Sequence, residues 1–122
     1  MRPDAPALLW DAREAARLIL VFIEGRSWQH YRADAMLRSA VERQFQIIGE
    51  ALNRLSRVDD ATAAVIPELA RIVAFRDVLV PGYAVIDDEL VWQVATTRVP
   101  GLVEILDRLL DQADTLEPES DS

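Results

Sequence analysis

The sequence contains no cysteine and no lysine, and its single histidine is His30. Without cysteine the chain can form neither a disulfide nor a thiolate metal site, so its core must be held by packing alone. The sequence therefore does not indicate whether the protein works in a reducing or an oxidising compartment. All 13 basic residues are arginine, a preference typical of a GC-rich genome, and we derive no function from it.

Long uninterrupted apolar runs are also missing, since no segment approaches the roughly 18 residues that would span a bilayer. The N-terminus shows no basic region followed by an apolar run and a small-residue cleavage site. We therefore expect a cytoplasmic protein with no membrane contact. The net charge of -8 opposes non-specific attraction to nucleic-acid phosphates, so any nucleic-acid site must be a local basic cleft.

A chain of 122 residues has room for one domain. Apolar residues continue to about residue 112, and the remaining residues are acidic, with proline and serine and little to bury. We expect a single helical domain over 1–112 and a frayed tail over 113–122.

Apolar residues recur at three-and-four spacing along most of the chain, which predicts amphipathic helices. The expected elements are a helix over 6–25, a short turn or helix over 27–31, long helices over 34–56 and 67–80, and a last helical stretch that starts after residue 87. Pro100 and Gly101 predict either a kink in this last stretch or its division into two helices. The expected fold is all-α, an up-and-down four-helix bundle with an extra short helix or a kinked C-terminal helix.

The residues most informative about function lie between Phe75 and Tyr83, where the sequence reads FRDVLVPGY. Pro81 and Gly82 are strong helix-stop signals. Arg76 is therefore expected near a helix end and Tyr83 in the loop that follows.

This stretch resembles the signature of the HepT-like group in the HEPN superfamily: an arginine, four residues, a histidine, one residue and a tyrosine. The frame here is Arg76, Pro81 and Tyr83, with proline at the histidine position. The segments 39–51, 85–92 and 100–102 are similar to other parts of the family pattern, so the resemblance covers about residues 7 to 110.

The resemblance implies an all-helical HEPN-like fold and a metal-independent endoribonuclease that is the toxin of a prokaryotic toxin–antitoxin pair, without a cofactor. It also implies a homodimer whose cleft forms between two subunits, a nucleotidyltransferase antitoxin as partner and RNA as substrate. In this family the arginine and histidine are catalytic, and the tyrosine accepts AMP from the antitoxin. Arg76 and Tyr83 would take these roles, while Pro81 has no proton to give or take.

Position 81 makes family membership and activity separate questions. Pro81 can act neither as acid nor as base, and Asp77 stands where the family commonly has asparagine, which places negative charge beside the expected phosphate site. Both departures predict impaired cleavage. Because one base change separates histidine and proline codons, Pro81 is either natural divergence or a substitution that relieves toxicity. A relocated base at His30 is a further alternative.

Each candidate residue also has a purely structural interpretation. Arg76 can pair with Asp77 or another carboxylate, and Tyr83 can hold the loop against the bundle. Gly49 lies inside a helix, where glycine costs about 1 kcal/mol relative to alanine, so close approach of another helix is expected there. Glu50 is either a solvated charge or a carboxylate of the cleft or interface. The alternative function is a non-catalytic dimeric binding module that serves as substrate or regulator of the nucleotidyltransferase, with Tyr83 as AMP acceptor.

Overall fold

The computed structural model describes residues 1–79 and 86–116, and in these ranges every regular element is an α-helix. The all-α prediction is therefore confirmed. The helices are α1 (Ala5–Ile23), α2 (Trp28–Ala33), α3 (Ala35–Val58), α4 (Asp60–Ala63), α5 (Leu69–Val78), α6 (Asp88–Thr97) and α7 (Val99–Leu116).

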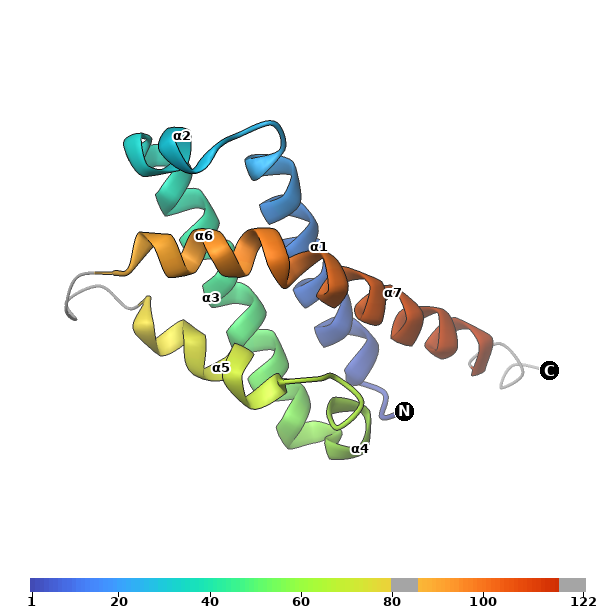
Figure 1. Cartoon of the computed structure of the whole chain (residues 1–122). Helices are drawn as coiled ribbons and strands as arrows, with labels where there is room; N and C mark the ends of the chain where they lie inside the picture. The colour runs from blue at the N-terminus through green and yellow to red at the C-terminus, as the bar shows by residue number, and fades with distance from the viewer. Residues whose placement is uncertain (80–85, 117–122) are drawn as a thin grey trace.

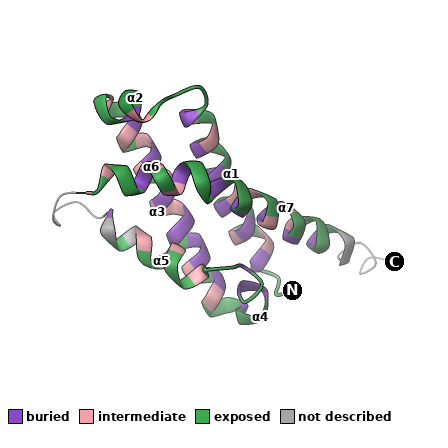
Figure 2. Ribbon diagram, viewed as in Figure 1, coloured by how far each residue is buried: buried purple, intermediate pink, exposed green. Residues whose placement is uncertain are grey.

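Helices α1 and α3 form the centre of the bundle and pack against each other along their length (Figure 1). The buried stripe of α1 is rich in alanine, and that of α3 carries larger aliphatic and aromatic side chains. Small side chains on one helix let the axes of a helix pair approach closely. The buried residues concentrate on the facing sides of these two helices (Figure 2).

The remaining long helices cover this pair from two directions (Figure 1). Helix α5 packs beside α3, and α7 packs beside α1, while α6 contacts both α1 and α2. Asp107 of α7 accepts from Arg13 and Arg17 of α1 at 3.3 and 3.0 Å, which fixes the contact between α1 and α7 on its polar side. The C-terminal end of α5 and the N-terminal end of α6 lie near each other at one side of the bundle (Figure 1).

Side-chain caps set the helix starts that the sequence predicts. The hydroxyl of Ser27 accepts from the amide of His30 at 3.1 Å, and the carboxylate of Asp34 accepts from the amide of Leu37 at 3.0 Å. Asp87 likewise accepts from Leu90 N at 3.1 Å and starts α6. Each cap satisfies an amide that has no partner within its helix, which stabilises a helix start by about 1 kcal/mol.

Three elements refine the expected boundaries. Pro67 lies in the turn before α5 and not in its first turn, because Glu68 adopts a positive φ of 57° and separates Pro67 from the helix. The polar segment after α3 contains a four-residue helix, α4. The last helical stretch is divided at Arg98 into α6 and α7, with Pro100 in the first turn of α7, where its missing N–H is tolerated.

Helix α7 continues to Leu116 and buries Ala113, so helical structure extends past residue 112. Residues 117–122 of the predicted tail lie outside the described residues. No helix in the described ranges is long and apolar enough to cross a membrane.

Candidate functional site

The structure describes part of the motif frame that the sequence singles out. The backbone of Arg76 lies in the last turn of α5, followed by the exposed Asp77. Pro81 and Tyr83 lie outside the described residues. On the neighbouring helix α3, Gly49 is buried and Glu50 is exposed. Gly49 is buried, as expected for a glycine where another helix approaches closely, while Glu50 faces solvent.

The chain enters the motif at Leu79, which is held against α3. The amide nitrogen of Gln46 donates to the backbone carbonyl of Leu79 at 3.0 Å, and the guanidinium of Arg43 donates to the amide oxygen of Gln46 at 3.2 Å. The second contact orients the amide, so that its NH2 group is directed at Leu79. An edge-to-face pair of Phe45 and Phe75, with ring centroids 5.1 Å apart, packs the apolar side of the same contact.

The chain leaves the motif at the start of α6, which is held to the same helix. The guanidinium of Arg38 lies 3.6 Å from the carboxylate of Asp88, the first residue of α6. Arg38 also donates to the backbone carbonyl of Arg32 at the end of α2. Helix α3 thus holds both ends of the segment 80–85, through Gln46 on one side and Arg38 on the other.

Glu42 lies midway between these two contacts on one flank of α3. Residues 38, 42 and 46 are four apart, so each lies about 6 Å further along the helix axis and about 40° further around it. Burial raises the pKa of the half-buried Glu42, and the negative charge of Asp88 raises it further, whereas the guanidinium of Arg38 lowers it. The result is a carboxyl group that takes up a proton more readily than an exposed glutamate.

Tyr31 of α2 is fully buried beside this flank, and its hydroxyl has no hydrogen-bond partner among the described residues. Its ring packs against Trp92 of α6 and Trp28 of α2, with centroids 5.2 and 6.3 Å away. Burial raises the pKa of Tyr31 well above its usual value, and the charges of Glu42 and Asp88 add to this shift. The phenol therefore stays protonated and remains a donor.

Sequence reasoning selected Gly49 and Glu50 on α3 and missed Arg38, Glu42 and Gln46. The signal that could have found them is the repeat of polar residues at four-residue spacing on the flank of a long amphipathic helix. The spacing of apolar residues predicts the helix over 34–56, but which of its flanks meets α5 and α6 depends on how those helices pack.

His30, the alternative base, is exposed on α2, and its Nε2 lies 2.7 Å from the guanidinium Nη1 of Arg26. In this pair the guanidinium is the donor and the imidazole nitrogen the acceptor. This hydrogen bond joins His30 to the α1–α2 connection and not to Leu79 or Asp88.

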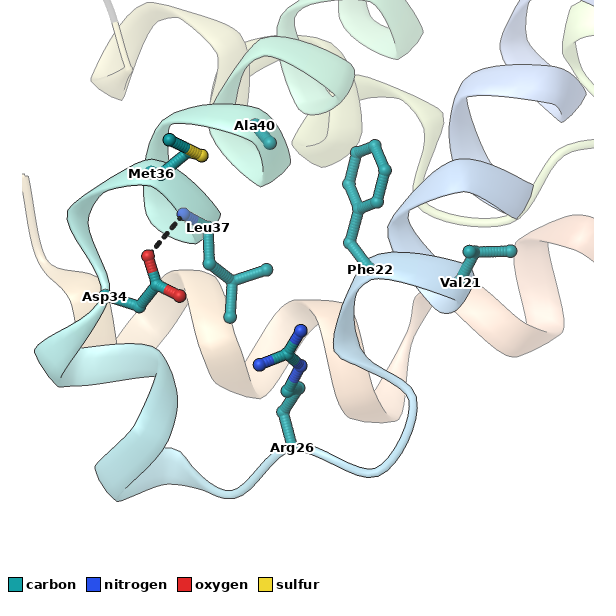
Figure 3. Close-up of a pocket in the computed structure, with 7 residues that line it drawn as sticks. All are labelled: Val21, Phe22, Arg26, Asp34, Met36, Leu37 and Ala40. Carbon is teal, nitrogen blue, oxygen red and sulfur yellow. Dashed lines mark hydrogen bonds between the residues drawn. The ribbon is translucent and has the colours of Figure 1, made fainter.

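A shallow hollow of about 310 Å³ lies where the end of α1 meets the start of α3, and its lining is mostly apolar (Figure 3). It is lined by Val21, Phe22, Arg26, Asp34, Met36, Leu37 and Ala40. Asp34 is already engaged as the cap of α3 through Leu37. With one guanidinium and one occupied carboxylate, this hollow offers an apolar contact surface and not a centre for proton transfer.

No group of three or more potential metal ligands occurs in the part of the chain that the structure describes. The chemistry available at the ends of the motif consists of arginine cations, the carboxyl groups of Glu42 and Asp88, and the backbone that they hold. Guanidinium groups bind phosphate oxygens, and a carboxyl group whose pKa is raised becomes a better proton acceptor than an exposed one.

Comparison with known proteins identifies the family. Residues 12–109 match the family described as Ribonuclease HepT-like. The chain belongs to this family. The match spans α3, α5 and α6 in full, so the helices that hold the two ends of the motif are those of the HepT-like fold.

Three proteins of Methanocaldococcus jannaschii are similar over most of this HepT-like chain. One named as a putative RNase is 29% identical over 97 residues, 80% of this chain and 88% of its own length. A second with the same description is 25% identical over 111 residues, 89% of each chain. The third, named as a gamma-glutamylcyclotransferase and putative RNase, is 27% identical over 93% of this chain. The HepT-like chain spans about half, 51%, of that relative's length. No solved structure matches the chain significantly.

Proposed function

We propose that this protein is the toxin component of a prokaryotic toxin–antitoxin module, a HEPN-type endoribonuclease whose cleavage is impaired by Pro81. Membership of the HepT-like ribonuclease family carries this proposal. Relatives named as putative RNases support RNA as the substrate class. Arg76 at the end of α5 would contact the scissile phosphate, and position 81 would supply proton transfer if it held histidine.

Two arginines near the ends of the motif support an RNA contact despite the net charge of -8. Arg38 and Arg43 both lie on α3 beside the contacts that hold the ends of the motif. Cations in a confined region attract phosphate more strongly than the average charge of the chain indicates. Asp77 would oppose this attraction, in line with weakened cleavage.

The expected loss of RNA cleavage can be stated as a ratio of two rates. A positioned acid or base typically contributes about a hundred- to ten-thousandfold to the rate of a reaction. Cleavage of a fluorescent single-stranded RNA by the protein as it stands should therefore be slower than cleavage by Pro81→His by a factor in that range. Equal rates, or no cleavage by either protein, would contradict the proposed function.

The same family resemblance supports a homodimer and a nucleotidyltransferase antitoxin that transfers AMP to Tyr83. The exposed apolar side chains Val21 and Met36 beside the hollow of Figure 3 offer a surface for a protein contact. Sedimentation of the purified protein tests the dimer. Incubation with the antitoxin and ATP, followed by mass spectrometry of the protein and of Tyr83→Phe, tests the modification.

A second candidate is the non-catalytic binding module, which is favoured by the absence of any titratable group at Pro81. In that case AMP transfer to Tyr83 is retained, while RNA is cleaved neither by the protein as it stands nor by Pro81→His. The two measurements above therefore separate the two functions.

A further inference from the structure

Glu42 is the one carboxyl group that lies on α3 between the contacts to Leu79 and Asp88, and it belongs to no part of the motif frame. The four-residue spacing of Arg38, Glu42 and Gln46 places all three on one flank of the helix. Both outer residues bind the chain at the ends of the motif, Gln46 through the carbonyl of Leu79 and Arg38 through Asp88. Glu42 is thus positioned where the entry to the motif and the exit from it come to the same helix.

The surroundings of Glu42 differ from those of the carboxylates that cap helices. No ion pair or hydrogen bond of its side chain is found among the described residues, whereas Asp34, Asp59 and Asp87 each cap a helix. A half-buried acid without such a partner loses hydration on folding. Such a group persists where its chemistry is used, because stability alone would favour its replacement.

Tyr31 gives a second, independent observation at the same flank. Its hydroxyl is fully buried and lacks a partner in the described ranges, although a buried donor left without an acceptor costs about 1–3 kcal/mol. The charges of Glu42 and Asp88 act on this phenol, as does that of Arg38. These three residues and Tyr31 are the titratable and charged groups that act on one another here, and they come from α2, α3 and α6.

We propose that Glu42 is the general base that remains in this protein, and that it takes the proton from the 2′-hydroxyl of RNA. This inference rests on the proposed function and deepens it, because it names the group that moves the proton in a chain whose frame has proline at position 81. Glu42 is half-buried and reachable from solvent, unlike Tyr31.

The step is a transesterification that balances without a further reactant. The carboxylate of Glu42 takes the 2′-hydroxyl proton, and the 2′-oxygen forms a bond to the adjacent phosphorus. The bond from phosphorus to the 5′-oxygen breaks, and that oxygen takes a proton from water. The hydroxide so formed takes the proton from Glu42, which restores the carboxylate. The products are a 2′,3′-cyclic phosphate and a 5′-hydroxyl.

The raised pKa of Glu42 fits this role. A base is most effective when its pKa lies near the working pH, because it is then deprotonated and still binds a proton well. Burial and the charge of Asp88 shift the pKa of Glu42 in that direction. The rate should fall as the pH falls through this raised pKa, since the protonated form cannot act as a base.

The test uses the full chain and a single-stranded RNA of mixed sequence that carries a fluorophore and a quencher. The protein as it stands should cleave it slowly, Glu42→Gln should lower kcat by about a hundredfold or more, and Glu42→Asp should retain part of the rate with a shifted pH profile. Glu104→Gln removes an exposed carboxylate of α7 and should leave the rate unchanged. RNA with 2′-O-methyl groups should not be cleaved by any of these proteins.

The outcomes separate this inference from the proposed function. If Pro81→His cleaves RNA and the protein as it stands does not, the proposed function holds and Glu42 is not the base. If both cleave and Glu42→Gln matches the unaltered protein, Glu42 is again excluded. If neither cleaves, both proposals fail. Circular dichroism of Glu42→Gln shows whether a lost rate comes from lost folding.

Discussion

Asp59 offers the sharpest test of how the start of the chain is joined to the bundle. Its carboxylate is buried and accepts three hydrogen bonds, from Arg2 N at 2.8 Å, from Thr62 N at 3.1 Å and from the hydroxyl of Thr62 at 2.7 Å. We expect Asp59→Ala to lower the free energy of unfolding by about 3 kcal/mol. Loss of the cap contributes about 1 kcal/mol, and the two further bonds to an ionised acceptor contribute about 1 kcal/mol each after the freed donors meet water.

The pH dependence gives this prediction a second, independent outcome. The hydrogen bond from the Arg2 amide lowers the pKa of Asp59 from its ordinary 3.8, and the Thr62 hydroxyl lowers it further. A lowered folded-state pKa stabilises the protein above the ordinary pKa, and this contribution is lost as the pH falls through the lowered one. The difference between Asp59→Ala and the unaltered protein should therefore shrink below about pH 4.

Urea unfolding followed by circular dichroism between pH 7 and pH 3 measures both effects. Asp60→Ala is the matched control, because Asp60 is the exposed neighbour in the first turn of α4. It removes the same charge and should cost at most about 1 kcal/mol through the helix dipole. Equal losses for the two variants at pH 7, or a loss for Asp59→Ala that does not change with pH, would refute this account of the Asp59 contacts.

Three further variants test the flank of α3. Gln46→Met keeps the length of the side chain and removes the donor to Leu79, so we expect the free energy of unfolding in urea to fall by about 1 kcal/mol. The same change made in Pro81→His should slow RNA cleavage. Unchanged stability would mean that Leu79 O finds another donor. Tyr31→Phe removes a buried hydroxyl without a described partner, so the free energy of unfolding should stay within about 0.5 kcal/mol of the unaltered protein or rise. A loss above about 1.5 kcal/mol would show that the hydroxyl has a partner. Glu42→Gln should raise stability at pH 7, because the raised pKa means that the ionised form is disfavoured in the folded protein. This gain should vanish as the pH falls below the ordinary pKa of glutamate. A loss of stability at pH 7 would assign Glu42 a structural role.

The sequence was sufficient for the elements whose signals are local. The helix starts expected near residues 27, 34 and 87 agree with the structure, where Ser27, Asp34 and Asp87 each accept a hydrogen bond from the amide three residues later. The start of α5 was predicted two residues early, because proline in a first helical turn is common and the positive φ of Glu68 leaves no mark in the sequence. Glu68 is held by Arg71 and by Arg98, which lies 30 positions away, so the correct boundary depends on a tertiary contact.

The sequence predicts residues of the candidate site only where they belong to one short motif with fixed spacing. Arg76 and Asp77 could be found because they belong to a frame of fixed spacing, but the chain around them is held by residues from another helix. Gln46 is 33 positions from Leu79, and no rule of helix spacing joins them. Such contacts are selected by how α3, α5 and α6 pack, which periodicity does not encode.

Helix α3 performs two tasks that place opposite demands on its residues. Its buried stripe supplies the centre of the bundle with Val41, Phe45 and Ile48, where any polar atom would be costly. Its flank carries polar side chains that hold the chain before and after position 81. The described contacts are made to Leu79, before the motif histidine position, and to Asp88, after it. If Glu42 is the base, as we propose, the same helix that holds the ends of the motif also supplies the group that moves the proton.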